Sequence, residues 1–124
     1  MQGRQFIRIA VCAGLLSASG SALAHHSNAG FDRDNPITLT GTVTTYLFTN
    51  PHTLIGFDVK DEKGAVTHWT LEAGPPHRMY KSGWTRNSLK PGDTITVTGD
   101  PSKDGKHWIF AGSSRIKILT KQSK

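Results

Sequence analysis

Apolar and polar residues alternate along several short stretches of the chain, and such alternation is typical of half-buried β-strands. In the first stretch, ITLTGTVTTYLF (37–48), one face carries Leu39, Val43 and Leu47. The opposite face is rich in threonine, a β-branched residue that favours strands. Gly41 interrupts the pattern and predicts a bulge or a sharp bend within this strand.

Two further stretches continue the alternation on either side of a turn. TLIGFDVK (53–60) and AVTHWTLEA (65–73) are predicted strands, and DEKG (61–64) is the predicted hairpin turn between them. Their apolar residues are expected to face inward: Ile55, Phe57, Val59, Trp69 and Leu71. Three polar residues of the second stretch are expected to face outward: His68, Thr70 and Glu72.

The rest of the pattern predicts a short helix and two more strands. GPPHRMYKSG (74–83) has proline near its start and glycine at its end, which favours one or two helical turns. TITVTG (94–99) and HWIFAGSSRIKIL (107–119) are the fourth and fifth predicted strands, with Gly112 as a kink in the last. Their inward residues are expected to be Ile95, Val97, Trp108, Phe110, Ile116 and Ile118.

This order of elements indicates the fold class. Three strands, a short helix and two strands predict an all-β domain, a small five-stranded OB-like barrel with a short helix between strands 3 and 4. The alternative is an open five-stranded sandwich. The three tryptophans, Trp69, Trp84 and Trp108, are assigned to the core, because a barrel this small needs large apolar side chains.

The chain begins with the pattern of a secretory signal peptide. The first eight residues are basic, with Arg4 and Arg8 and no acidic residue. An apolar run covers 9–16, and Ala22-Leu23-Ala24 forms a small-x-small cleavage site. The run is shorter than the roughly 20 residues that span a membrane, so no membrane span is predicted. The predicted organisation is a signal peptide (1–24), an irregular arm (25–36), the OB-like domain (37–119) and a basic tail (120–124) of a periplasmic or secreted protein.

Cleavage after Ala24 changes both the cysteine content and the charge. It removes Cys12, the only cysteine, so the mature chain has neither a disulfide nor a thiolate ligand. It also removes two arginines, which leaves 13 basic against 9 acidic residues and a net charge of +4. A mildly basic surface attracts anions, although scattered lysines are an ordinary feature of solvated surfaces. Export disfavours nucleic acid as a partner.

Cleavage after Ala24 would also make His25 the first residue, next to His26. A terminal amine has a pKa near 8 and can lose its proton to a metal, so His25 would offer the amine and a ring nitrogen as a chelate. His26, or His52 from the loop after the first strand, would add an imidazole. Nitrogen ligands in a planar arrangement suit Cu(II) best, ahead of Ni(II) and Zn(II). We therefore expect a metal site, with copper as cofactor, at His25, His26 and His52.

OB barrels usually bind ligands on strands 2 and 3 and the adjoining loops. The candidates on this face are Asn50, Asp58, His68 and Glu72. Asp58 and Glu72 could face each other as a carboxylate pair of the kind used in acid–base catalysis, but so small a barrel offers no deep pocket and we expect no enzyme. A copper-dependent oxidation is the one catalytic alternative. The alternative function is a metal-free module that binds a small anionic ligand or a partner protein through this face and a basic loop with Lys103 and Lys106.

The chain also resembles a family of small exported bacterial proteins known as a domain of unknown function. The resemblance rests on the linked order of HHS (25–27), TNPH (49–52), the W and E of HWTLEAG, and GWTRNSLKPGD (83–93). It covers about residues 25 to 105 and implies an exported OB-like β domain, without a demonstrated activity. The family pattern falls on His25, His26, Ser27, Asn50, Pro51, His52, Trp69, Glu72, Gly83, Trp84, Pro91, Gly92 and Asp93. The chain departs from it at Leu47-Phe48 and Thr53.

Overall fold

A computed structural model describes residues 29–123. Its elements follow one another in the predicted order of strands, helix and strands. They are β1 (Ile37–Leu47), β2 (Leu54–Lys60), β3 (Val66–Glu72), α1 (Pro76–Lys81), β4 (Thr94–Pro101), β5 (Trp108–Phe110), the 3-10 turn η1 (Ser113–Arg115) and β6 (Ile116–Thr120). The predicted signal peptide and the start of the predicted arm, with His25 and His26, lie outside the described residues.

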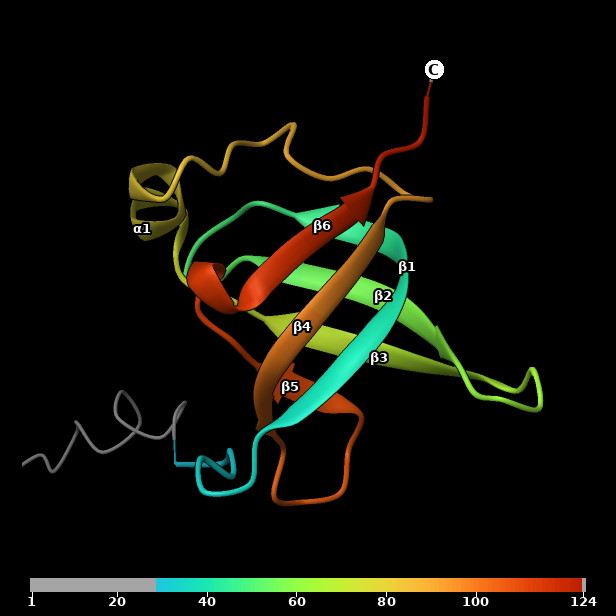
Figure 1. Ribbon diagram of the computed structural model, residues 1–124. Helices are drawn as coiled ribbons and strands as arrows, with labels where there is room; N and C mark the ends of the chain where they lie inside the picture. Colours follow the sequence, from blue (N-terminus) through green and yellow to red (C-terminus); the bar gives the residue numbers. More distant parts are fainter. Residues whose placement is uncertain (1–28, 124) are drawn as a thin grey trace, which may run out of the picture.

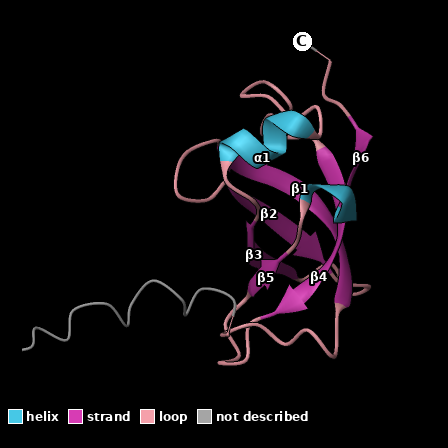
Figure 2. Cartoon of the chain, turned by 90° about the vertical axis from the view of Figure 1, so that its left-hand side faces the viewer, coloured by secondary structure: helices cyan, strands magenta, loops and turns pink. Residues whose placement is uncertain are grey.

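The strands close into a barrel. β1 pairs with β2 through its second half and with β4 through its first half, as the strand curves around the barrel in Figure 1. β3 pairs with β2 on one side and, in parallel, with β5 on the other, and β5 returns to β4. Figure 2 shows the same strands from the side, with α1 at one end of the barrel. The predicted OB-like barrel with its short helix is confirmed, and the open sandwich is not found.

Two predictions about β1 are wrong: the bulge lies beyond Gly41, and Leu47 does not face inward. The pairing with β2 shifts between Val43 and Thr45, so the bulge falls at Thr44. The extra residue reverses the face to which each later side chain of the strand points. Leu47, predicted to face inward, is therefore 53% exposed, whereas Phe48 is buried. Gly41 instead allows the backbone of β1 to lie close to that of β2, because a Cβ at this position would lie 2.4 Å from the backbone oxygen of Asp58.

The predicted fifth strand is divided into β5 and β6, and two residues predicted to face inward, Trp108 and Phe110, do not. Ile109 is the buried residue of β5, and its neighbour Trp108, assigned to the core, is 37% exposed. Gly112 and the turn η1 separate the halves, and they shift the alternation by one residue. Ile116 of β6 is therefore buried as predicted, whereas in β5 the odd-numbered residue, Ile109, faces the core.

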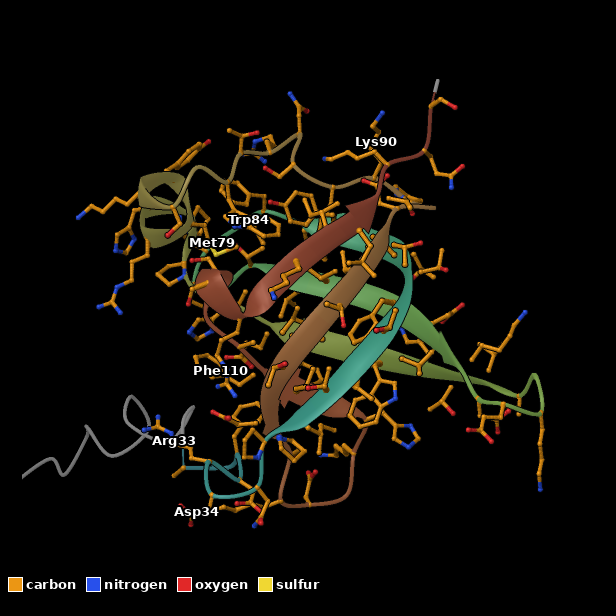
Figure 3. The ribbon with its side chains drawn as sticks, in the orientation of Figure 1. Arg33, Asp34, Met79, Trp84, Lys90 and Phe110 are labelled. Atoms are coloured by element: carbon orange, nitrogen blue, oxygen red, sulfur yellow. The ribbon has the colours of Figure 1, made fainter. Side chains whose placement is uncertain are left out.

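The core fills the barrel and is closed at the end near α1. Its fully buried strand residues come from the five strands β1 to β5, namely Val43, Ile55, Phe57, Leu71, Ile95, Val97 and Ile109. Met79 of α1 and Trp84 close that end, and Figure 3 shows both between the helix and β6. The helix ends as its glycine predicts, because Gly83 has a φ of 82°.

The end of the chain is bound to the barrel rather than forming a free tail from residue 120. Thr120 belongs to β6, and the backbone N–H of Gln122 donates to the Asp93 carboxylate at 2.8 Å. The backbone N–H of Lys90 donates to the same carboxylate, and these bonds hold the pKa of buried Asp93 below its usual value. Within residues 29–123 no helix is both long enough and apolar enough to span a membrane.

Candidate functional site

His52 and Glu72 form a close pair on the outside of the barrel. The His52 Nδ1 lies 3.0 Å from the Glu72 Oε1, at the point where the loop after β1 enters β2 and where β3 ends. The side chains are 32% and 12% exposed, respectively, so the imidazole is accessible while the carboxylate is nearly covered. The sequence identified both residues as site candidates but did not predict that they meet.

The backbone explains why the loop presents His52 to Glu72. The Thr53 N–H donates to the Gly74 carbonyl at 3.1 Å, and the Ala73 N–H donates to the Thr53 carbonyl at 2.9 Å. These two bonds extend the pairing of β2 with β3 beyond Leu54. Because side chains alternate along a strand, His52 then points to the same outer face as Glu72.

The environment of Glu72 shapes the chemistry of the imidazole. Burial raises the pKa of Glu72, and the nearby His52 opposes that rise. A carboxylate oxygen beside Nδ1 favours a proton on that nitrogen, which leaves the lone pair of Nε2 for another partner. A histidine oriented in this way by a carboxylate is a common metal ligand in proteins.

A second histidine–carboxylate pair lies on the same face. His68 and Asp58 are directly opposite in the pairing of β2 with β3, and the His68 Nδ1 is hydrogen-bonded to the Asp58 Oδ1 at 2.7 Å. His68 faces solvent, as predicted. The possible carboxylate pair is not formed, because the register places Asp58 opposite His68 and Glu72 opposite Leu54.

The arm before β1 approaches the barrel near the first of these pairs. The Phe31 ring packs on Phe110 with 5.7 Å between ring centroids, and Phe110 is the register partner of Glu72. Figure 3 shows Phe110 on the side of the barrel where the arm lies. The Asp32 N–H donates to the Pro101 carbonyl at 2.8 Å, which fixes the arm to the end of β4.

The described part of the arm therefore begins close to Glu72. Neighbouring strands lie about 4.8 Å apart, so Phe110 and Glu72 are adjacent. His26 precedes Phe31 by five residues, which span at most about 17 Å when extended. The positions of His25 and His26 themselves are outside the described residues. Phe31 and Phe110 were not identified from the sequence as part of a site, and no motif marks them.

The described residues do not make a complete metal centre on their own. Between residues 29 and 123, no group of three or more His, Cys, Asp and Glu side chains could hold a metal ion. His52 and Glu72 are only two such groups, so a metal bound there needs further ligands from elsewhere. The predicted ligands from the arm are those outside the described range.

Among residues 29–123, no hydrogen bond or ion pair joins Asn50, Lys103 or Lys106 to this pair. Asn50 is exposed and lines a hollow between the loop after β1 and α1. In the basic loop, the Lys106 Nζ lies 2.9 Å from the Asp104 Oδ2, so its charge is already partnered. Lys103 lines a different, shallow hollow with Phe31 and Arg33.

Comparisons with known proteins agree with the fold and add no activity. A family model described as a family of unknown function, DUF6152, matches residues 12–110. No curated protein matches the chain. Among solved structures, the chain is similar to Rim1, a mitochondrial single-stranded DNA binding protein from S. cerevisiae, with a TM-score of 0.52 and 8% identity over 71% of this chain and 96% of Rim1. At that identity the likeness concerns the fold alone.

Proposed function

Since this chain belongs to the family of unknown function DUF6152, we propose from its own geometry that it is an exported metal-binding barrel that holds copper through His25, His26 and His52. The observation that carries the proposal is the position of His52. Its imidazole lies outside the core, beside Glu72, and the arm is anchored one strand away by Phe31 and Phe110. A short arm can therefore bring the two remaining histidines to the loop.

Copper is the metal that best matches the proposed ligands. Processing between Ala24 and His25 would give a terminal amine whose pKa is near 8, and the amine and the ring of His25 would bind one ion as a chelate. His52 would add an imidazole from the rigid barrel, and His26 a further one from the arm. Several nitrogen ligands with no thiolate favour Cu(II) over the other common divalent ions.

Glu72 has a supporting role in this proposal. Its carboxylate lies beside the Nδ1 of His52 and would keep the ring turned so that Nε2 faces the metal. Such orienting carboxylates raise the basicity of the ligand, and their loss typically weakens metal binding by about 10- to 100-fold. The proposed role is binding of the ion, not catalysis.

The test is a Cu(II) titration followed by EPR on protein that begins at His25. We expect one tightly bound equivalent with nitrogen hyperfine structure. The His52→Ala variant and a protein with one extra residue before His25 should each bind at least about tenfold more weakly, because each loses a ligand that the chelate needs. His68→Ala is the matched control, since it removes a histidine from the same face without touching the loop.

Two results would contradict the proposal. If His52→Ala binds copper as the unaltered protein does, the terminal histidines chelate the ion without the barrel. If the exported protein retains Ala24, the terminal amine is not on His25 and the chelate does not exist. N-terminal sequencing of the exported protein decides the second point.

The alternative function, a metal-free module for an anion on the β2–β3 face, has less support. Its basic loop is predicted to supply the positive charge, but Lys106 is already paired with Asp104. The same face carries the Asp58 carboxylate, which repels an anion.

A further inference from the structure

A hollow of roughly 400 Å³ lies at the end of the barrel near α1, and its lining includes Asn50, two residues before the proposed copper ligand His52. Three segments enclose it: residues 48–50 after β1, three residues of α1, and Arg86 in the loop that follows the helix. Its size is at the lower end of the range for small-molecule sites. We propose that it binds a small aromatic carboxylate, an inference that goes beyond the proposed copper binding and does not depend on it.

Aromatic rings form the apolar wall of the hollow. Phe48 is buried and meets Tyr80 edge to face, with 5.0 Å between their ring centroids. The Tyr46 ring also packs on Phe48, with 5.8 Å between ring centroids, so the Phe48 ring has two aromatic neighbours. Tyr80 itself remains 53% exposed, so its ring is accessible from the hollow that it lines. A planar ring of a ligand would cover this surface in the tilted or edge-to-face arrangements that aromatic pairs prefer.

Positive charge and hydrogen-bond donors occupy the polar side. Arg86 and His77 line the hollow, and none of its lining residues is acidic. An arginine guanidinium is always charged and can hold a carboxylate through two parallel hydrogen bonds. The amide of Asn50 and the hydroxyl of Thr49 add neutral polar groups at the rim. The hollow therefore selects for a negative charge next to an apolar ring.

The backbone around Arg86 is held in place. The Tyr46 hydroxyl donates to the Thr85 carbonyl at 2.8 Å, which ties the loop to β1. The Thr85 N–H donates to the Ser88 hydroxyl at 2.7 Å, and the Asn87 N–H donates to the Thr85 hydroxyl at 3.2 Å. Because its neighbours on both sides are fixed, Arg86 is presented from a defined position, which lowers the entropic cost of binding.

The experiment titrates the metal-free protein with benzoate and follows backbone amide resonances by NMR. Benzyl alcohol keeps the ring without the charge, and acetate keeps the charge without the ring. We expect saturable shifts around residues 48–50, Tyr80 and Arg86 with benzoate. Binding should be at least about tenfold weaker with either partial probe, because benzyl alcohol loses the charged hydrogen bonds to Arg86 and acetate loses the contact with the aromatic rings. Metal-free protein is used so that failure here is independent of copper binding.

Variants identify the groups responsible. Arg86→Gln should weaken benzoate binding by about tenfold and leave binding of benzyl alcohol unchanged, because it removes only the charged partner. Arg78→Gln is the matched control, since it removes an exposed arginine from α1 that does not line the hollow. The proposal is overturned if benzoate gives no saturable shifts, if acetate binds equally well, or if Arg86→Gln and Arg78→Gln have the same effect.

Discussion

Two histidine–carboxylate pairs on the outer face of β2 and β3 have the same chemistry but different surroundings. The pair of His68 and Asp58 has the shorter distance, 2.7 Å, yet its side chains are 58% and 40% exposed. In the pair of His52 and Glu72, the His52 Nδ1 lies 3.0 Å from the Glu72 Oε1, and this pair is much better covered. The shorter contact is thus expected to have the smaller interaction energy, because water screens charges at an exposed site.

The neighbours of each pair account for the difference. Glu72 lies at the end of β3 beside Phe110, on which the Phe31 ring of the arm packs. His68 lies nearer the β2–β3 hairpin, with its ring against Gly56, and its side chain remains 58% exposed. Only the first pair is adjacent to the segment that is predicted to carry further ligands. Burial and position, not distance, distinguish the candidate site from a surface contact.

The largest expected difference concerns stability. Glu72→Ala should lower the free energy of unfolding by about 2 kcal/mol, because the lost packing of a covered side chain and the lost contact with His52 outweigh the relief of the desolvation that raises the pKa of Glu72. Asp58→Ala is the matched variant and should cost no more than about 0.5 kcal/mol, as is usual for exposed pairs. Urea unfolding of the metal-free proteins measures both values. Equal losses in the two variants would show that burial does not separate the pairs.

The arm offers the next largest effect. Phe31→Ala removes the ring that packs on Phe110, so the arm should spend less time near His52 and its effective concentration there should fall. We expect copper affinity to drop by about tenfold, measured by competition with a chelator of known affinity. The barrel ligand itself is untouched by this change. An unchanged affinity would mean that the arm needs no anchor or that it binds copper elsewhere.

A double-mutant cycle compares the two pairs directly. Histidine and carboxylate are each replaced by alanine, singly and together, and the coupling energy is taken from urea unfolding. We expect about 1 kcal/mol for His52 with Glu72 and about 0.3 kcal/mol for His68 with Asp58, because the second pair is more strongly screened. A larger coupling at His68 and Asp58 would reverse the comparison and make bond length the deciding property.

The smallest expected effect is the change in copper affinity caused by a substitution in the exposed pair. Asp58→Asn should leave copper affinity within about twofold of the unaltered protein, because Asp58 contacts His68 and not the loop. Glu72→Gln is its counterpart and should weaken binding by about tenfold. Isothermal titration on protein that begins at His25 measures both. If Asp58→Asn weakened copper binding as much as Glu72→Gln does, the ion would be bound nearer the middle of the β2–β3 face.

Much of the fold was predictable from the sequence because local rules apply to it. Alternation identified the strands, and proline and glycine marked the ends of α1. The errors at Leu47 and Trp108 arose where the alternation changes side, at the bulge in β1 and at the turn before β6. No characteristic amino acid marks the extra residue of this bulge or turn, so only the pairing of the strands reveals it.

The candidate site was predictable only in part. The turn TNPH (49–52) indicated that His52 belongs to a loop where this fold binds ligands. The structure places His52 on the outer face beside Glu72. The meeting of His52 with Glu72 and the packing of Phe31 on Phe110 join residues far apart in the chain. The hollow lined by Phe48, Tyr80 and Arg86 is also assembled from separate segments, and no spacing in the sequence indicates it.

The sequence by itself therefore determined the elements, their order and the kinds of side chain available. Alternation and turn residues act between near neighbours, and an all-β barrel follows from them. The tertiary structure alone decided which histidine is paired with a covered carboxylate and which with an exposed one. The physical reason is that contacts across the sheet depend on the exact pairing of the strands: a shift of one residue between strands turns every side chain to the other face and exchanges its neighbours.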